Sequence, residues 1–426
     1  MRSASAMVLA GGRGKRMDIL CHGRPKPVLP FAGIFRVIDF TLSNCLNSGI
    51  RHIGVLVDYQ KRYLADYLEE WSRVNQAVKG LIPLAPKVGS YKGTADAVFQ
   101  NLDYLQKYGA QDIVVLAGDH VYRMNYRNML DHHERTGADV TIGVFSVPIE
   151  HAHRFGIVTP DAEGRIIDFT EKPRNPMSNL VSMGIYVFKR EILVQHLAED
   201  SADPSSVHDF GYSIIPKMVR QHKVFCYRFD GYWQDIGTVE AYYEANMELT
   251  HKMSSLGLNG KWPIFTKDAA WPLPKLDHQG VVTNSLISPG CTVKGEVINS
   301  VLSAGVKVEA QAVVRNSVIM GNTVIGKHSV VDGCVLDEDV NVGEFCYIGF
   351  GNTLLNDGCN ITVLGKGVTV PNGTAIGKNC KILPAAGPND FAADRVAPGS
   401  VILRRQPDPP AQPEKTEAKT AEPVLN

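Results

Sequence analysis

The residues best suited to chemistry lie close to the start of the chain. The segment 9–17 reads LAGGRGKRM, and RPKP follows at 24–27. Its glycines let the backbone approach a ligand closely, and the N–H groups of such a turn can bind an anion. Four side chains add positive charge: Arg13, Lys15, Arg16 and Lys26. We therefore predict that this segment binds a polyphosphate.

The residue order excludes two common phosphate-binding loops. A Walker loop places Ser or Thr after Gly-Lys, whereas Arg16 follows Gly14-Lys15 here. A dinucleotide fingerprint needs a third glycine, and Met17 stands at that position. A tight turn without a ligand is the alternative, but the four cations and the rigid Pro25-Lys26-Pro27 segment favour a binding loop.

Two aspartates are candidate metal ligands. Asp119 follows the apolar stretch Asp112–Ala117, and Asp235 lies in the segment YWQDIGT, just before a predicted helix Thr238–Leu249. Mg²⁺ prefers a few carboxylates together with phosphate oxygens. A turn-forming Asp119 and a helix-capping Asp235 are the alternatives. We predict that both carboxylates bind Mg²⁺ against the polyphosphate.

Further polar groups suit a sugar phosphate and a base. Lys172, in Glu171-Lys172-Pro173, could bind phosphate as a point charge, although a solvated loop lysine is the alternative. Ser182 and Asp209 offer groups for sugar hydroxyls. Gly93, close to Tyr91 at a predicted helix start, could let a base pack against the backbone.

Apolar strands and helical patterns alternate through residues 1–255, the predicted catalytic domain. This alternation predicts a mostly parallel, Rossmann-like α/β sheet covered by helices. Ligands bind such sheets at the carboxyl ends of the strands, which places the glycine loop and Asp119 at one edge. The predicted strands are Ala6–Ala10, His52–Leu56, Asp112–Ala117, Val140–Ser146 and Met183–Phe188; the predicted helices include Tyr63–Ser72, Ala95–Tyr108 and Tyr126–Thr136.

Residues 281–402 have a different pattern, with an aliphatic residue at every sixth position. This spacing predicts a left-handed parallel β-helix, preceded by a linker at 256–280 and followed by a disordered tail at 403–426. One six-residue grid comprises Val306, Ala312, Val318, Val324, Val330, Leu336, Val342 and Ile348, and a second register comprises Leu364, Val370, Ile376 and Ile382.

Composition narrows the class of protein. The 426 residues carry equal numbers of acidic and basic side chains and a formal net charge of zero, which gives no indication of a nucleic-acid or membrane partner. No apolar run reaches the length of a membrane span. The eight cysteines form no C-x-x-C pair, so we expect reduced cysteines in a cytoplasmic protein.

Several segments, in order, resemble the bacterial glucose-1-phosphate adenylyltransferases (ADP-glucose pyrophosphorylases), within the sugar-phosphate nucleotidyltransferases. The resemblance covers residues 6–250, and the β-helix extends it to about 345. Besides the glycine loop, it rests on FRVIDF (35–40), LSNC (42–45), NSGIR (47–51), GTADAV (93–98), SMGIYVF (182–188) and HDFG (208–211).

This resemblance implies a reaction, in which ATP and glucose 1-phosphate give ADP-glucose and pyrophosphate with Mg²⁺. It also implies a homotetramer, and sugar phosphates or AMP as effectors. The implied phosphate and metal residues are Arg16, Lys26, Asp119 and Asp235. The implied sugar-phosphate site comprises Lys172, Glu171, Ser182, Gly184, Tyr186, Asp209, Trp233 and Gly156, and the implied nucleotide contacts are Leu9, Gly11, Gly12, Tyr91 and Gly93.

The chain departs from the family pattern at Gln234, where an arginine is usual, and at Ser90 and Asp58. These departures leave open another nucleoside triphosphate or sugar phosphate. A non-catalytic regulatory subunit and an acyltransferase β-helix are further alternatives. The first is disfavoured because the metal carboxylates and Lys172 are present, the second because His328 is the only histidine in 281–402. The extra coil at 349–390 is interpreted as structural, with a second ligand site as its alternative.

Overall fold

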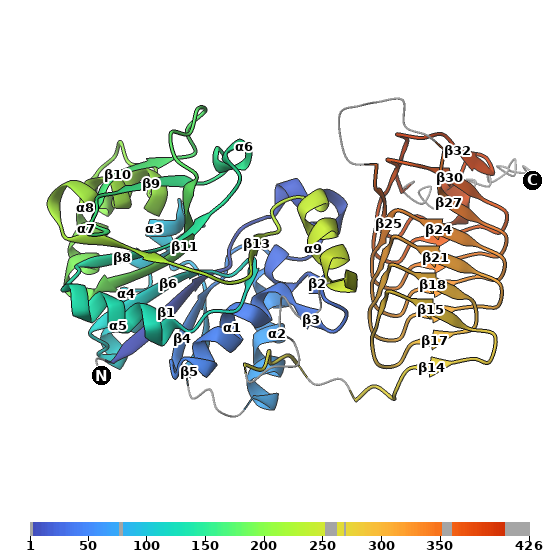
Figure 1. Cartoon of the computed structure of the whole chain (residues 1–426), viewed down its shortest axis with the longest axis horizontal. Helices are drawn as coiled ribbons and strands as arrows, with labels where there is room; N and C mark the ends of the chain where they lie inside the picture. Colours follow the sequence, from blue (N-terminus) through green and yellow to red (C-terminus); the bar gives the residue numbers. More distant parts are fainter. Residues whose placement is uncertain (1–2, 76–79, 252–261, 268–269, 352–359, 405–426) are drawn as a thin grey trace, which may run out of the picture.

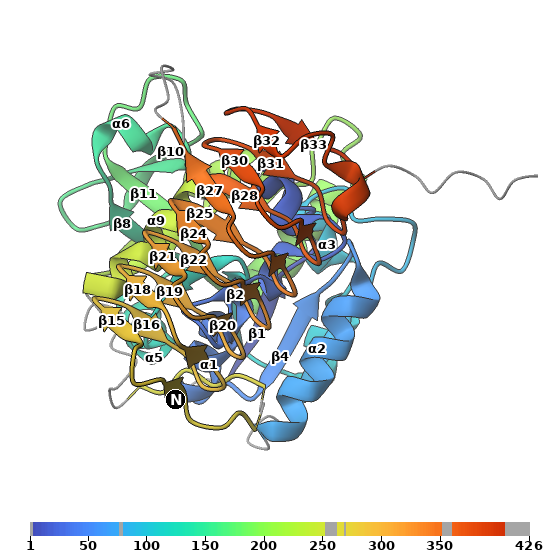
Figure 2. The ribbon, with the colours of Figure 1, turned by 90° about the vertical axis from the view of Figure 1, so that its right-hand side faces the viewer.

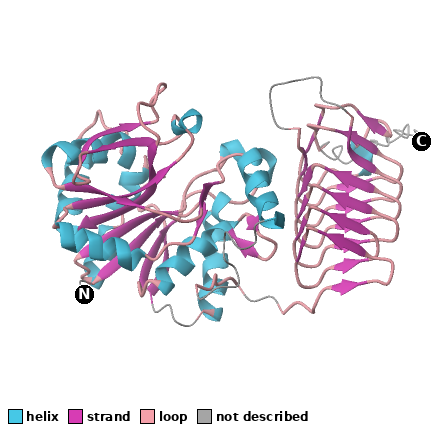
Figure 3. Cartoon of the chain, in the orientation of Figure 1, coloured by secondary structure: helices cyan, strands magenta, loops and turns pink. Residues whose placement is uncertain are grey.

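The computed structural model describes residues 3–75, 80–251, 262–267, 270–351 and 360–404. They form an α/β domain that carries the N-terminus and a β-helix that stands beside it (Figure 1). Figure 3 shows the change from mixed helix and strand in the first domain to mainly strand in the second. The predicted tail falls almost wholly outside the described residues, and so do parts of the predicted linker.

A nine-stranded sheet forms the centre of the α/β domain, with the order β10-β9-β11-β6-β1-β4-β5, while β8 joins β11 to β12. The bounds are β1 (Ala4–Leu9), β4 (His52–Leu56), β5 (Gly80–Leu84), β6 (Asp112–Ala117), β8 (Val140–Ser146), β9 (Gly156–Pro160), β10 (Ile166–Glu171), β11 (Leu180–Lys189) and β12 (Val224–Arg228).

One half of this sheet is parallel, as expected from the sequence. β1 pairs in parallel with β4 and β6, and Leu9 lies opposite both Leu56 and Ala117. The loops that follow these three strands therefore leave the sheet at the same edge. β11 runs antiparallel to β6 and β8. The sheet is therefore mixed beyond β6, and β11 has its amino end, not its carboxyl end, at the edge where β1, β4 and β6 end.

Helices cover the sheet with bounds close to those expected, except at one position. The expected helix Ala95–Tyr108 is two helices, because the backbone leaves helical geometry at Asn101, whose amide donates to Ala97 O (2.9 Å) and to Tyr91 Oη (3.0 Å). The helices are α1 (Val37–Asn47), α2 (Lys61–Val74), α3 (Thr94–Phe99), α4 (Leu102–Tyr108), α5 (Tyr126–Thr136), α6 (Ile149–Ala152), α7 (Arg190–Ala202), α8 (Ile215–Gln221) and α9 (Val239–His251).

The β-helix is built from three parallel sheets, whose described strands run from β14 (Lys275–Leu276) to β33 (Val401–Ile402). Figure 2 shows its coils stacked in front of the catalytic domain. A typical coil comprises β20 (Lys307–Val308), β21 (Val313–Arg315) and β22 (Val318–Ile319); the next comprises β23 (Val324–Ile325), β24 (Val330–Asp332) and β25 (Cys334–Leu336). Val308 pairs with Ile325 and Val314 with Val331, so paired positions in these two coils are 17 residues apart rather than 18.

The unbroken six-residue grid predicted between Val306 and Ile348 is therefore wrong in part. Val324 and Val330 are only half-buried, and the residues after them, Ile325 and Val331, are the fully buried ones. In these coils one corner is one residue shorter than the other two. There a buried hydroxyl replaces an aliphatic contact: Ser317 Oγ donates to Arg315 O (2.7 Å) and accepts from Cys334 N (3.1 Å). The second register, Leu364 to Ile382, is buried as predicted.

Residues 262–267 of the predicted linker pack on the catalytic domain, whereas Lys275–Leu276 already form the first described strand of the β-helix. Phe265 O accepts from Trp71 Nε1 (3.2 Å), Phe265 N donates to Ser43 Oγ (2.8 Å), and Trp262 Nε1 donates to Asn44 Oδ1 (3.0 Å). These bonds anchor the chain between the two domains to α1 and α2.

An ion-pair network joins the β-helix to the glycine-loop region. Arg24, two residues before Lys26, is 4% exposed and contacts Asp337 Oδ1 at 2.8 Å and Glu338 Oε2 at 3.1 Å. Glu338 also contacts Arg36 at 2.7 Å. Because an unpaired buried charge is unfavourable, the β-helix fixes the backbone that leads into Lys26.

The described cysteines are free and buried, as expected. Among the described helices, none combines the length and apolarity needed to span a bilayer.

We predict that Asp337→Ala destabilises the protein by about 3 kcal/mol, because it leaves Arg24 buried without its closest carboxylate. Urea denaturation measures this change. The matched control is Asp332→Ala, which removes the exposed ion pair with Arg315 and is expected to cost less than about 1 kcal/mol. Equal losses in both variants would contradict a stabilising role for the interdomain network.

Candidate active site

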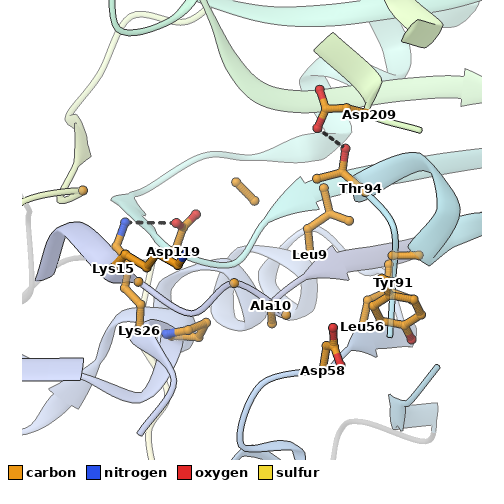
Figure 4. A pocket seen from close by; sticks show the side chains of 18 of the residues that line it. Leu9, Ala10, Lys15, Lys26, Leu56, Asp58, Tyr91, Thr94, Asp119 and Asp209 are labelled. Carbon is orange, nitrogen blue, oxygen red and sulfur yellow. Dashed lines mark hydrogen bonds and ion pairs between the residues drawn. The ribbon is translucent and has the colours of Figure 1, made fainter. Parts of the chain in front are cut away.

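A cavity of about 540 Å³ opens at the carboxyl edge of β1, β4 and β6. Figure 4 shows side chains from these three strand ends, together with Tyr91, Thr94 and Asp209, around the same space. Its lining residues are Leu9, Ala10, Gly11, Gly12, Gly14, Lys15, Arg16, Lys26, Pro27, Leu56, Asp58, Tyr91, Gly93, Thr94, Ala97, Ala117, Asp119, Asp209 and Gly237.

The glycine loop follows β1 directly and has the expected backbone. Gly14 has φ +61°, in the left-handed region, and its carbonyl accepts from Met17 N (2.8 Å) at the start of a short 3₁₀ turn. A Cβ on Gly11 would lie 3.2 Å from Asp58 Cβ, whereas a Cβ on Gly12 would meet no protein atom within 4 Å. The space beside Gly12 is therefore open to a ligand.

The most concentrated charge at this edge surrounds Lys26. Its Nζ lies 2.9 Å from Asp119 Oδ2 and 3.6 Å from Asp235 Oδ1, and the side chain is 6% exposed. Burial alone would lower the pKa of Lys26, but the charges of Asp119 and Asp235 outweigh it and raise that pKa. Removal from bulk water would raise the pKa of Asp119, yet Lys26 and His120 bring it down to about 2. Lys26 and Asp119 are therefore both charged near neutral pH.

A two-stranded antiparallel sheet brings the two carboxylates together. β7 (His120–Tyr122) pairs antiparallel with β13 (Trp233–Asp235), and Asp235 lies opposite His120. His120 Nε2 is 3.7 Å from Asp119 Oδ1 and 3.8 Å from Asp235 Oδ1. Asp235 thus reaches the edge of the cavity from a segment more than a hundred residues away in the chain.

The donor set fits Mg²⁺ bound together with phosphate. Among the described residues, no group of three or more His, Cys, Asp or Glu side chains is placed to hold a metal ion by protein ligands alone. Two carboxylates within reach of one ammonium group instead suit an ion that takes its remaining ligands from phosphate and water. Asp119 and Asp235 are the residues that could hold it.

The opposite end of the cavity is organised by Asp209 and Thr94. Thr94 Oγ1 donates to Asp209 Oδ2 (2.9 Å) and accepts from Phe210 N (3.0 Å). A Cβ on Gly93 would lie only 2.3 Å from His208 O. Glycine at position 93 therefore allows the Asp209 segment to pack against the start of α3.

The other residues expected to bind sugar lie beside this cavity rather than in its lining. Glu171 Oε1 pairs with Lys172 Nζ at 2.7 Å, and Lys172 has φ +44°. A Cβ at Gly156 or Gly211 would lie within 2.6 Å of Glu171 Oε2, so these glycines make room for the carboxylate. The pair Glu171 and Lys172 thus forms a second polar centre.

β11 supplies the remaining sugar-side residues. Its register shifts between Ser182 and Tyr186, where Gly184 has φ +67°. Ser182 Oγ donates to Tyr186 Oη (3.3 Å), and the Tyr186 ring stacks on Phe210 with centroids 5.8 Å apart. Trp233 packs against His120 with ring centroids 5.4 Å apart, which links this side to the carboxylates.

Sequence reasoning did not assign site roles to Asp58 and Arg154. Asp58 lines the cavity after β4 and had been noticed only as a departure from the family pattern. Arg154 Nη2 lies 3.8 Å from Asp235 Oδ2, and no motif marks it. Gln234 is exposed, between Trp233 and Asp235 on β13; since strand side chains alternate in direction, it points away from the Asp235 carboxylate.

Comparison with known proteins supports the same interpretation. Residues 5–252 match the nucleotidyl transferase family, and residues 273–370 match a GlmU-like, C-terminal hexapeptide family. A glucose-1-phosphate adenylyltransferase of Thermotoga neapolitana is 43% identical over 424 residues, covering 95% of this chain and 100% of that protein. The chain belongs to the glucose-1-phosphate adenylyltransferase family.

Other glucose-1-phosphate adenylyltransferases are similar over a comparable length. That of Acetivibrio thermocellus is 40% identical and covers 94% of this chain and 97% of its own length. That of Thermomicrobium roseum is 42% identical, with 94% and 98% covered. The adenylyltransferase similarity thus extends over both domains, and the fold is a nucleotidyltransferase domain followed by a left-handed β-helix.

We predict different effects for two glycine substitutions in the cavity. Gly93→Ala forces a methyl group against His208 O and is expected to destabilise the protein by about 1–3 kcal/mol. Gly12→Ala places its methyl group in open space and is expected to change stability by less than about 0.5 kcal/mol, while raising the nucleotide KM at least about tenfold by filling the phosphate position. Thermal unfolding and initial rates measure the two effects.

Each of the two glycine predictions has an outcome that would contradict it. An unchanged nucleotide KM in Gly12→Ala would show that the phosphates do not pass beside Gly12. An undisturbed Gly93→Ala variant would show that the Asp209 segment does not depend on that contact.

Proposed function

We propose that this protein transfers the adenylyl group of ATP to glucose 1-phosphate, giving ADP-glucose and pyrophosphate for α-glucan synthesis. Family membership supports the reaction class and the substrates. The single structural observation that carries the assignment is Lys26, held between Asp119 and Asp235 at the end of the glycine loop. This is an arrangement for bringing polyphosphate, metal and a second phosphate together.

The reaction requires no nucleophile from the protein. An oxygen of the sugar phosphate attacks the α-phosphorus of ATP, and the bond from that phosphorus to the α–β bridging oxygen breaks. Pyrophosphate leaves with the electron pair of that bond. The protein's contribution is to orient two anions and to stabilise the charge of the transition state.

We assign the phosphate work to the glycine loop. Backbone N–H groups at Gly11 and Gly12, with Arg16, would bind the triphosphate, and Lys26 would move from the carboxylates to phosphate oxygens. Asp119 and Asp235 would hold Mg²⁺. Bound there, the ion would neutralise phosphate charge and orient the oxygens around the α-phosphorus.

We assign the nucleoside of ATP to one part of the site and glucose 1-phosphate to another. Leu9, Tyr91 and Gly93 would contact the nucleoside, since they line the cavity beyond the phosphates. Lys172 would bind the phosphate of glucose 1-phosphate. The glucose ring would lie among Glu171, Ser182, Gly184, Tyr186, Asp209, Trp233 and Gly156.

The alternatives have less support. The exposed Gln234 leaves the Asp235 carboxylate unaltered, which weakens the argument for another substrate pair. His328, the candidate base for acyl transfer, is exposed and stacks on Phe345 at a 4.7 Å centroid distance, as a surface residue would. A regulatory subunit would have no need for the buried Lys26 between two carboxylates.

The assembly and regulation stay predictions. A homotetramer and effectors of the sugar-phosphate or AMP type are implied by the family. Exposed apolar side chains on the β-helix, including Val281, Val282 and Tyr347, offer a surface for subunit contacts. Sedimentation analysis and rates with added fructose 6-phosphate, fructose 1,6-bisphosphate or AMP test these expectations.

We predict that ATP with glucose 1-phosphate gives the highest kcat/KM in a matrix of nucleoside triphosphates and sugar 1-phosphates, measured by pyrophosphate release. Another pair ranking first would refute the substrate assignment.

We further predict that Asp119→Asn lowers kcat about 100- to 1000-fold, because it removes a charge that positions the ion and phosphates. The matched control is Asp103→Asn, at an exposed carboxylate that forms an ion pair with Lys87 and lies outside the cavity lining, which should leave kcat unchanged. An Asp119→Asn variant within a few-fold of wild type would rule out the proposed mechanism.

A further inference from the structure

Arg154 has one guanidinium nitrogen without a hydrogen-bond partner among the described residues, although its guanidinium also lies over the Phe155 ring, 5.7 Å from the centroid. Its Nη2 atom is buried and makes no hydrogen bond within the described residues. This nitrogen forms a long ion pair with Asp235 Oδ2, 3.8 Å away. A buried donor without a partner costs about 1–3 kcal/mol, so this nitrogen is better suited to a ligand than to the protein alone.

The neighbours of Arg154 place it between the Lys26, Asp119 and Asp235 cluster and the Glu171–Lys172 pair. It lies in the short connection between α6 (Ile149–Ala152) and β9 (Gly156–Pro160). The next residue, Phe155, accepts a hydrogen bond from Lys172 N at its carbonyl (3.1 Å) and packs its ring 5.4 Å from that of Trp233. Arg154 therefore connects the Asp235 side of the site to the Glu171 and Lys172 side.

The charges around Asp235 show what binding would change. Its Oδ1 faces Lys26 at 3.6 Å and His120 at 3.8 Å, while Oδ2 faces Arg154. If Asp235 holds a divalent ion, its carboxylate is engaged by the metal, and the guanidinium of Arg154 loses its ion-pair partner. A phosphate group arriving at the metal would supply a replacement, and guanidinium groups bind phosphate with paired N–H donors.

Of the substrate phosphates, the phosphate of the sugar 1-phosphate is the one expected next to Arg154. The triphosphate is expected along the glycine loop, whose cations come from Lys15, Arg16 and Lys26. The sugar is expected beside Glu171 and Lys172. The phosphate that joins the sugar to the α-phosphorus must pass between these places, where Arg154 lies.

We propose that Arg154 is a further substrate-binding residue that contacts the phosphate of the sugar 1-phosphate from the side opposite Lys26. This inference rests on the proposed function for the identity of the substrate. Its alternative is a purely structural ion pair with Asp235, which would affect the metal and the triphosphate instead.

The test compares Arg154→Met and Arg154→Lys with wild type, and uses Arg165→Met, at an exposed arginine of the same domain, as the matched control. We expect Arg154→Met to raise the glucose 1-phosphate KM at least about tenfold, equivalent to about 1.4 kcal/mol, with the ATP KM within about twofold. Arg154→Lys should restore part of the loss, because the charge returns without the paired donors. Arg165→Met should match wild type.

Binding supplies a readout that does not depend on turnover. Calorimetric titration of glucose 1-phosphate into the protein should show a dissociation constant raised about tenfold in Arg154→Met and unchanged in Arg165→Met. An unchanged dissociation constant and KM would overturn the proposal. A loss divided equally between ATP, Mg²⁺ and glucose 1-phosphate would overturn it too, in favour of the structural ion pair.

The proposed function fails separately. Its failure would be seen in the wild-type protein, as the absence of ADP-glucose formation from ATP and glucose 1-phosphate. Failure of the Arg154 proposal would be seen only in the ratio between variant and wild type.

Discussion

The ammonium group of Lys26, buried between Asp119 and Asp235, is the interaction on which the rest of the site depends. It joins three segments that are far apart in the chain: the glycine loop, the end of β6 and the strand β13. The two carboxylates raise the pKa of Lys26, and Lys26 with His120 brings the pKa of Asp119 down to about 2. The lysine compensates the charge of the two carboxylates, and in the proposed mechanism it would exchange them for phosphate oxygens.

This cluster is held from outside as well as from within. Arg24, two residues before Lys26, is buried against Asp337 and Glu338 of the β-helix, and Lys381 of the same domain pairs with Asp18 of the turn after Gly14. The β-helix therefore contacts the chain between Gly14 and Lys26 at two points, Asp18 and Arg24. A change in how the two domains pack would reach the loop directly, which gives the second domain a physical connection to the chemistry.

Much of this organisation could be predicted from the sequence, because it depends on local patterns. The glycine loop, the strand ends and the carboxylate of Asp119 follow from apolar runs and the residues after them. The six-residue grid held only in part, missing at Val324 and Val330. Ser317 lies at a shortened corner of the coil, and hydrophobic spacing does not reveal which of two adjacent aliphatic residues points inward. The break at Asn101 depends on its side-chain amide contacting Tyr91, and the position of Arg154 beside Asp235 depends on tertiary packing that no spacing encodes.

The central claim is that phosphates and metal meet at Lys26, Asp119 and Asp235. The most direct test is a crystal structure of the protein with a non-hydrolysable ATP analogue and Mn²⁺, with the metal located by its anomalous scattering. The account predicts a manganese peak in contact with both carboxylates, the triphosphate along Gly11 to Lys15, and the Lys26 ammonium turned from the carboxylates to phosphate oxygens. A nucleotide bound elsewhere, or a metal that contacts neither Asp119 nor Asp235, would contradict it.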